Sequence, residues 1–155
     1  MPIIGEADRD ALRQQFEESL DRDVTIKLFS ESEIRSMLTI PGRTANPMAK
    51  LAKDLAEELA ELSPKIKLEM YDVHGDGVEA ARAMGIDRTP AYVLGDDPEG
   101  RLRFYGTPVG NEFATIIATV EALSQNTPHL SSNLIAAMER LIEAPVHIQV
   151  FVTPT

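Results

Sequence analysis

The stretch AYVLGDDPEGRLRFY, residues 91–105, decides the fold. Its two ends, Ala91–Leu94 and Arg101–Tyr105, are short and rich in aliphatic and aromatic side chains, as strands are. Residues 95–100 between them carry glycine, aspartate and proline, which are typical turn formers. We therefore expect an antiparallel hairpin of two short strands.

Two further strands are predicted before the hairpin, because apolar and polar side chains alternate over residues 24–29 and again over residues 66–71. Between them, apolar residues recur at three- and four-residue spacing from Met48 to Leu62, which predicts an amphipathic helix with Asn46 as its N-cap. A right-handed helical crossover makes these two strands parallel. Two shorter helices are expected over residues 7–20 and 76–84.

The pattern after the hairpin is a helix, a second helix and a strand. The first helix is expected over residues 111–123. The second is capped by Ser131 or Ser132 and ended by Pro145. Four aliphatic side chains at alternate positions then predict a last strand: Val146, Ile148, Val150 and Val152.

The order of these elements predicts an α/β fold with a central mixed four-stranded sheet flanked by helices, plus a C-terminal helix and an extra strand. We divide the chain into a domain over residues 1–125, which includes the helix at 7–20, and a helix-plus-strand segment over residues 126–155. Inspection finds no internal repeat.

Composition excludes several classes of function. The 155 residues are 43% hydrophobic and 26% charged, with a net charge of −10, which opposes binding to nucleic acid or to anionic membranes. The chain has no cysteine, so disulfides, thiolate nucleophiles and thiolate metal sites are all absent. Charged residues follow the first few residues directly and leave no apolar leader, so we expect a cytoplasmic protein.

Four stretches carry a resemblance to a known family. Together they resemble the N-terminal thioredoxin-fold unit of the glutaredoxin-like protein disulfide oxidoreductases, which hold two such folds in tandem, and more distantly the N-terminal domain of the flavin-dependent alkyl hydroperoxide reductase. The resemblance implies a thioredoxin-like fold and a role in cell redox homeostasis. The stretches are Leu68–Asp72, Gly85–Ala91, Arg103–Phe113 and Pro145–Thr155. By the same resemblance, the helix-plus-strand segment over residues 126–155 resembles the start of a second thioredoxin unit.

The same resemblance implies where a redox site would lie. The family's Cys-x-x-Cys pair aligns with Asn46, Pro47, Met48 and Ala49, so both cysteine positions are changed and no catalytic residue is expected. Thr89 and Pro90 align with the family's cis-proline loop, which faces that site and pairs with extended substrates. A substrate groove without its nucleophile is thus implied.

Three functions compete. The first is a redox-inactive module of the protein disulfide oxidoreductase family, which acts as a scaffold, a dimerisation unit or a docking site for a protein or peptide. The second is a truncated first unit of an active thiol–disulfide oxidoreductase, whose Cys-x-x-Cys lies downstream of Thr155. An enzyme with non-thiol chemistry in the old groove ranks last, because no nucleophile or base is evident. The last predicted strand favours pairing with its own sheet or with a second copy of the chain.

The remaining candidates are better explained as structure, and we expect no metal and no cofactor. Asp72, His74 and Asp76 imitate the start of a calcium loop, but Ala83 stands where the bidentate glutamate is required. The three histidines, His74, His129 and His147, are far apart in sequence. Glu57, Glu58 and Glu61 are predicted to form a solvated helix face.

Overall fold

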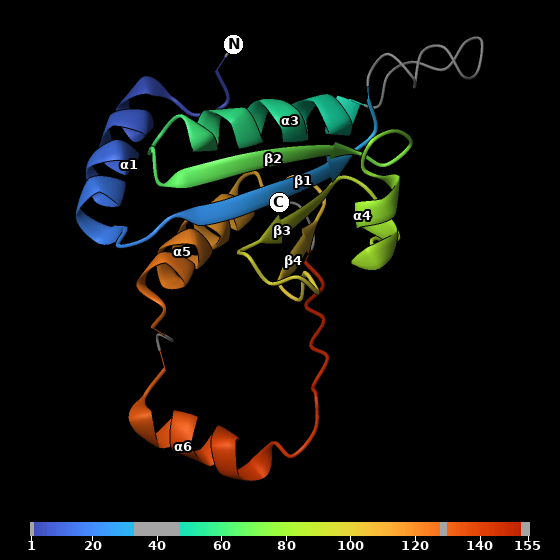
Figure 1. Ribbon diagram of the computed structural model, residues 1–155. Helices are drawn as coiled ribbons and strands as arrows, with labels where there is room; N and C mark the ends of the chain where they lie inside the picture. The colour runs from blue at the N-terminus through green and yellow to red at the C-terminus, as the bar shows by residue number, and fades with distance from the viewer. Residues whose placement is uncertain (1, 33–46, 128–129, 153–155) are drawn as a thin grey trace.

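A four-stranded mixed sheet forms the centre of the molecule (Figure 1). The computed structural model describes residues 2–32, 47–127 and 130–152. The strands lie in the order β2-β1-β3-β4, where β1 is parallel to β2 and antiparallel to β3, and β3 is antiparallel to β4. The predicted parallel pair and the predicted hairpin are therefore confirmed. The bounds are β1 Val24–Ser30, β2 Ile66–Asp72, β3 Ala91–Leu94 and β4 Arg103–Tyr105.

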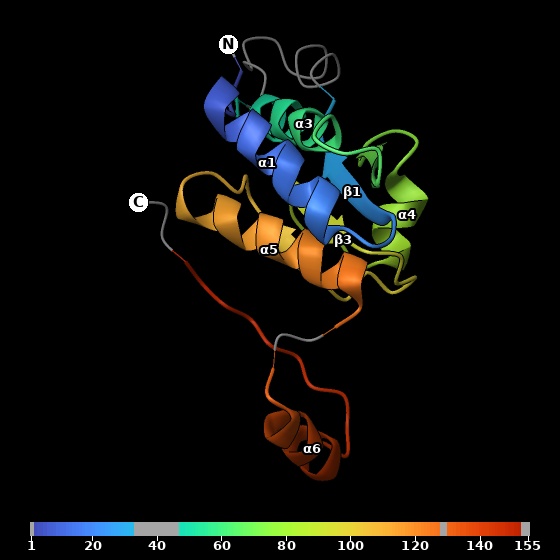
Figure 2. The same ribbon diagram turned by 90° about the vertical axis from the view of Figure 1, so that its left-hand side faces the viewer.

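One face of the sheet is covered by three helices, α1 (Glu6–Ser19), α3 (Pro47–Ala60) and α5 (Asn111–Gln125), as Figures 1 and 2 show. Strand β1 runs through the middle and is buried on both faces, because a central strand between two layers of helices has no solvent side. The side chains that fill this core are almost all aliphatic. They include Ile26, Leu28, Leu55, Leu59, Ile116 and Val120, each no more than 1% exposed.

Helix α4 (Val78–Ala83) covers the opposite face and packs over Phe29, whose ring stacks on that of Tyr71 at 4.9 Å. The prediction places this helix over residues 76–84, and the observed helix is shorter at both ends, chiefly at its start. Before it, the Asp72 carbonyl accepts the N–H groups of Gly75 and Gly77, each at 2.9 Å, and a Cβ atom at Gly77 would come within 2.7 Å of the Tyr71 Cβ. This close approach lets the turn before α4 lie directly against β2.

Glu58 contradicts the prediction of a solvated acidic face on α3. Its carboxylate accepts hydrogen bonds from the backbone N–H groups of Ile3 and Ile4, at 2.7 and 2.9 Å, and pairs with Arg9 at 2.9 Å. Only 13% of its side chain is exposed, whereas Glu61 is 65% exposed. The chain before α1 folds back over α3 and covers Glu58, which helical spacing alone does not show.

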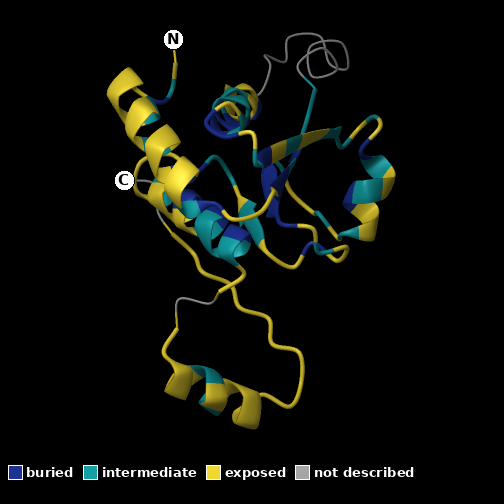
Figure 3. Cartoon of the chain, turned by 60° about the vertical axis from the view of Figure 1, so that its left-hand side comes forward, coloured by how far each residue is buried: buried dark blue, intermediate teal, exposed yellow. Residues whose placement is uncertain are grey.

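The predicted C-terminal helix is present, and the predicted extra strand is not. Helix α6 (Ser132–Leu141) begins after Ser131, whose hydroxyl accepts a hydrogen bond from the Leu134 N–H at 3.3 Å. Residues 146–152 pair with no strand in the described part of the chain, and their large apolar side chains are 59–85% exposed, yellow in Figure 3. Alternation is enough to suggest a strand, but a strand forms only where a second strand takes up its backbone hydrogen bonds.

Candidate functional site

The start of α3 lies where the resemblance implies a Cys-x-x-Cys pair. Asn46 is outside the described residues, and Pro47 is the first residue of the helix. Met48 is 48% exposed, whereas Ala49 is 6% exposed and packs inward. Proline suits a first helical position, because its missing N–H would have no partner there. None of Pro47, Met48 and Ala49 supplies a nucleophile, an acid or a base.

The Thr89–Pro90 peptide bond is cis. Pro90 is buried and Thr89 is partly exposed, directly before the start of β3. The Pro90 carbonyl accepts a hydrogen bond from the Gly106 N–H at 2.8 Å, which ties this loop to the residue after β4. Within the described part of the chain, neither backbone group of Thr89 has a hydrogen-bond partner. The N–H and the carbonyl of this partly exposed residue are therefore left unpaired in the described part of the chain.

The loop from β4 to α5 connects these two segments. Gly106 adopts φ +101°, where a side chain would be strained, and this turns the chain toward α3. The next residue, Thr107, donates a hydrogen bond from its hydroxyl to the Met48 carbonyl at 3.3 Å, and Pro108 is buried beneath. The cis-proline loop and the start of α3, far apart in sequence, are thereby held side by side.

An ion pair between Arg88 and Asp87 flanks the cis-proline loop. The Arg88 guanidinium makes two hydrogen bonds to the Asp87 carboxylate, at 3.1 and 3.0 Å, and lies 5.3 Å from the centre of the Tyr105 ring. The bond to Arg88 holds the pKa of the Asp87 carboxyl below its usual value. Both groups stay charged near neutral pH and largely cancel, so this flank is polar but carries little net charge.

Tyr92, two residues after the cis bond, has a structural role. Its side chain is fully buried, and its hydroxyl donates a hydrogen bond to the Ala52 carbonyl in α3 at 2.6 Å. Burial raises the pKa of Tyr92, so the phenol stays protonated. The residue fixes β3, and with it the cis-proline loop, beneath α3.

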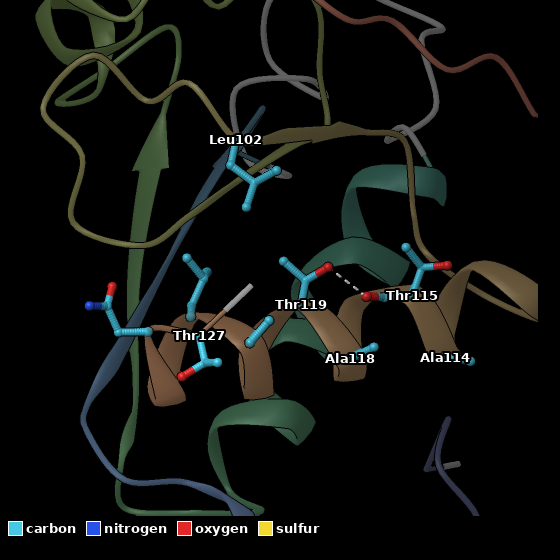
Figure 4. Close-up of a pocket in the computed structure, with 9 residues that line it drawn as sticks. Leu102, Ala114, Thr115, Ala118, Thr119 and Thr127 are labelled. Atoms are coloured by element: carbon cyan, nitrogen blue, oxygen red, sulfur yellow. Dashed lines mark hydrogen bonds between the residues drawn. The ribbon is translucent and has the colours of Figure 1, made fainter. Parts of the chain in front are cut away.

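Two hollows lie elsewhere on the surface, and sequence reasoning missed both. The larger, about 760 Å³, runs along α5 near Leu102, and Figure 4 shows the alanine and threonine side chains of α5 among the residues that line it. Its signal in the sequence is Ala114, Ala118 and Ala122 at four-residue spacing. The smaller, about 470 Å³, lies between the start of α1 and the start of α5. Neither is lined by Met48, Thr89 or Pro90.

The calcium-like segment is a hydrogen-bonded turn. The Asp72 carboxylate accepts the His74 N–H at 2.9 Å, and the Asp76 carboxylate accepts the Asp72 N–H at 3.2 Å. Across residues 2–32, 47–127 and 130–152, no three histidine or acidic side chains gather as metal ligands would. Among the same residues, no helix has the length and apolar character needed to cross a bilayer.

The topology has counterparts among solved structures. A protein disulfide oxidoreductase from Aeropyrum pernix K1 matches with a TM-score of 0.72 over 89% of this chain, at 19% sequence identity. The fold is thioredoxin-like. The NTD_N/C domain of the alkylhydroperoxide reductase AhpF of Enterococcus faecalis (V583) matches with a TM-score of 0.68 over 89% of this chain, at 22% identity. A cysteine-to-alanine mutant of AhpF from the same organism gives a TM-score of 0.67 over 88%, also at 22% identity.

The predicted fold class is thus confirmed for the four-stranded sheet and its helices. This chain spans 55–61% of the length of those three solved chains. No family model matches the sequence, and no curated protein does. At this level of identity the similarity is one of fold. Because the chain has no cysteine, it has no thiol with which to carry out thiol–disulfide exchange.

Proposed function

We propose that this chain is a redox-inactive thioredoxin-like module that docks an extended protein segment beside the cis-proline loop. It carries out no thiol–disulfide exchange, because the attacking group in that reaction is a thiolate and the chain has no cysteine. What remains of the site is a surface, and docking is the function a surface without a nucleophile supports.

The observation that carries the proposal is the link from Pro90 through Gly106 and Thr107 to Met48. This link holds the cis-proline loop against the start of α3, although no reacting group is left for that geometry to serve. The open backbone groups of Thr89 lie at the edge of this surface. An extended peptide binds such an edge by forming main-chain hydrogen bonds with it.

The side chains around Thr89 indicate which segments would bind. Met48 offers a half-exposed apolar contact on one side, and Tyr105, 37% exposed, offers an aromatic one near Arg88. Because Asp87 compensates Arg88, the local surface selects weakly for charge. The net charge of −10 over the whole chain favours neutral or basic partners through long-range attraction. We therefore expect apolar segments with neutral or basic neighbours.

The test is a titration of the isotope-labelled chain, with its amide NMR shifts as the readout. The probe is the insulin B chain with its cysteines alkylated, which supplies an extended polypeptide without free thiols. We expect the amide signals of Thr89, Ala91 and Met48 to shift together, and that of Ala118 in the hollow on α5 to stay in place. Shifts confined to the α5 hollow would contradict the proposal.

A matched pair of variants sharpens this test. Met48→Glu places a charge beside the cis-proline loop and is expected to weaken binding of the alkylated B chain about tenfold. Leu102→Glu changes a side chain of similar exposure, 44% against 48%, but lies at the α5 hollow and should leave the affinity unchanged. Equal effects of the two substitutions would place docking somewhere other than at Thr89.

A second candidate function is favoured by one observation. The chain spans only 55–61% of the length of the solved chains it matches. It would then serve as the first unit of a larger thiol–disulfide oxidoreductase, with catalytic cysteines beyond Thr155. Sequencing the gene past the codon for Thr155 decides this, because a Cys-x-x-Cys in frame supports the larger enzyme and a stop codon contradicts it.

A further inference from the structure

Strand β2 has an outer edge that pairs with nothing in the described part of the chain. Its seven residues pair with β1 along the inner side, while at its two ends the Ile66 N–H donates to the Ser63 carbonyl and the Asp72 N–H to the Asp76 carboxylate. Ile66 and Leu68 lie on the face covered by α3, and Met70 continues the row but is 46% exposed. An apolar side chain at the end of an open edge is incompletely covered, and an added strand would bury it.

The segment over residues 146–152, which we name the arm, has the length and the side-chain pattern of a strand that could pair with this edge. It is seven residues long, the length of β2, and it alternates Val146, Ile148 and Val150 with polar side chains. Those three side chains are 63–80% exposed and belong to neither core cluster. The arm therefore presents the alternating pattern of a strand without a described sheet partner.

The register of pairing between the arm and β2 can be inferred from an internal repeat, although none was expected from the sequence. The unit α1–β1 and the unit formed by α6 and the arm match at one constant offset. Because β1 already pairs with β2 in a known parallel register, the arm carries the same side-chain pattern toward the same strand. The identical pairs are Leu12 and Leu134, Glu17 and Glu139, Val24 and Val146, Ile26 and Ile148, and Phe29 and Phe151.

We propose that two copies of this chain associate reciprocally, with the arm of each added parallel to the outer edge of β2 in the other. The arm repeats on the outer edge the register that β1 has on the inner one. Ile148 then lies opposite Leu68 and Val150 opposite Met70, on the face that α3 covers. Phe151 lies opposite Tyr71 on the other face, where Phe29 already stacks on Tyr71.

The pairing suits a second copy better than the arm's own sheet. Figure 1 places α6 beyond the β4 side of the sheet, whereas β2 forms the opposite edge. The nearer edge, β4, has only three residues and cannot pair a seven-residue arm along its length. The polar positions of the arm, His147 and Gln149, would lie opposite Lys67 and Glu69, so that the neutral Gln149 sets no like charge against Glu69. A reciprocal exchange uses the same two surfaces twice and closes as a two-fold dimer.

Sedimentation equilibrium of the full chain tests the association. We expect a dimer, and we expect Ile148→Asp to make it monomeric, because a carboxylate would be buried opposite Leu68. Leu141→Asp is the matched control, since Leu141 is 73% exposed against 79% for Ile148 but lies in α6. A monomeric wild-type chain, or equal dissociation by both substitutions, would overturn the proposal.

Engineered cysteines test the register, and the natural absence of cysteine makes the result unambiguous. The pair Gln149→Cys with Glu69→Cys is expected to form a disulfide between two chains on mild oxidation, because opposite residues on neighbouring strands lie within bonding reach. The pair Gln149→Cys with Glu79→Cys, whose second site is exposed on α4, should not. Cross-linking of both pairs to the same extent, or a disulfide within one chain, would contradict the reciprocal pairing.

Discussion

Glu58 shows how a single carboxylate ties three segments together. It accepts two backbone N–H groups ahead of α1 and pairs with Arg9 within α1, while its own backbone belongs to α3. Burial tends to raise the pKa of this carboxyl, but the bonds from Arg9, Ile4 and Ile3 outweigh burial and lower it. Helical spacing predicts an exposed residue here, because the covering segment is distant in sequence.

Glu58→Gln should lower the free energy of unfolding by about 1–3 kcal/mol at pH 7, since the Arg9 partner and two amides lose a charged acceptor. A lowered folded pKa means that the contribution is complete above the unfolded value of about 4.3 and is lost as the pH falls through the folded value. The gap between wild type and variant should therefore close below pH 4. Chemical denaturation at pH 7 and pH 3 measures it, with Glu61→Gln as a control of small effect. A gap that is equal at both pH values would contradict this role.

Tyr92→Phe removes the buried hydroxyl that donates to the Ala52 carbonyl. We expect a loss of about 1 kcal/mol in the free energy of unfolding, because the ring stays packed and only the net value of one hydrogen bond is lost. Tyr105→Phe, at the exposed end of β4, should change stability by less than about 0.5 kcal/mol. Urea denaturation of both variants is the measurement, and similar losses from the two would be inconsistent with a buried anchor at Tyr92.

The elements whose pattern is local were predictable from the sequence. The apolar spacing in α3 and the alternation in β1 and β2 indicated these elements because each pattern marks the buried side chains of one segment. The turn residues between β3 and β4 indicated the hairpin because they favour turn conformations. The arm was not predictable, since its alternation says what it could pair with but not whether a partner is present. The contact from Thr107 to Met48 was also missed, because side-chain hydrogen bonds between distant loops leave no periodic trace.

Ser131→Ala removes the N-cap of α6 and should destabilise that helix by about 1 kcal/mol. No side chain of α6 belongs to either core cluster, so the global unfolding midpoint should stay the same. Hydrogen exchange measures the stability of α6, and we expect about fivefold faster exchange over residues 135–141 with unchanged protection in β1. Urea denaturation measures the global midpoint. Ser132→Ala serves as the control, and a marked fall in the global midpoint for Ser131→Ala would show that α6 is part of the main cooperative unit.

At the scale of the whole molecule, the chain has a thioredoxin-like fold but no cysteine, the residue on which thiol–disulfide chemistry depends. The sheet order, the cis-proline loop and the buried start of α3 at Ala49 are all in place. The fold could be predicted because it follows from the order of elements and from the resemblance, whereas the position of a site at Thr89 and the start of α3 stays a prediction. The sequence of a docked partner is not predictable, since the backbone edge proposed at Thr89 would accept many sequences.

If the chain lacks thiol–disulfide activity only because it has no cysteine, introducing two cysteines at the start of α3 should restore that activity. The double variant Asn46→Cys with Ala49→Cys places two thiols at the beginning of α3, where the helix dipole and unpaired amides stabilise a thiolate. Titration of the first thiol by its thiolate absorbance is the most direct measurement. A pKa of about 7 or below, with catalysed reduction of insulin, is the predicted result. A folded variant whose thiol titrates at about 8.5, like an unperturbed cysteine, and leaves insulin intact would contradict it.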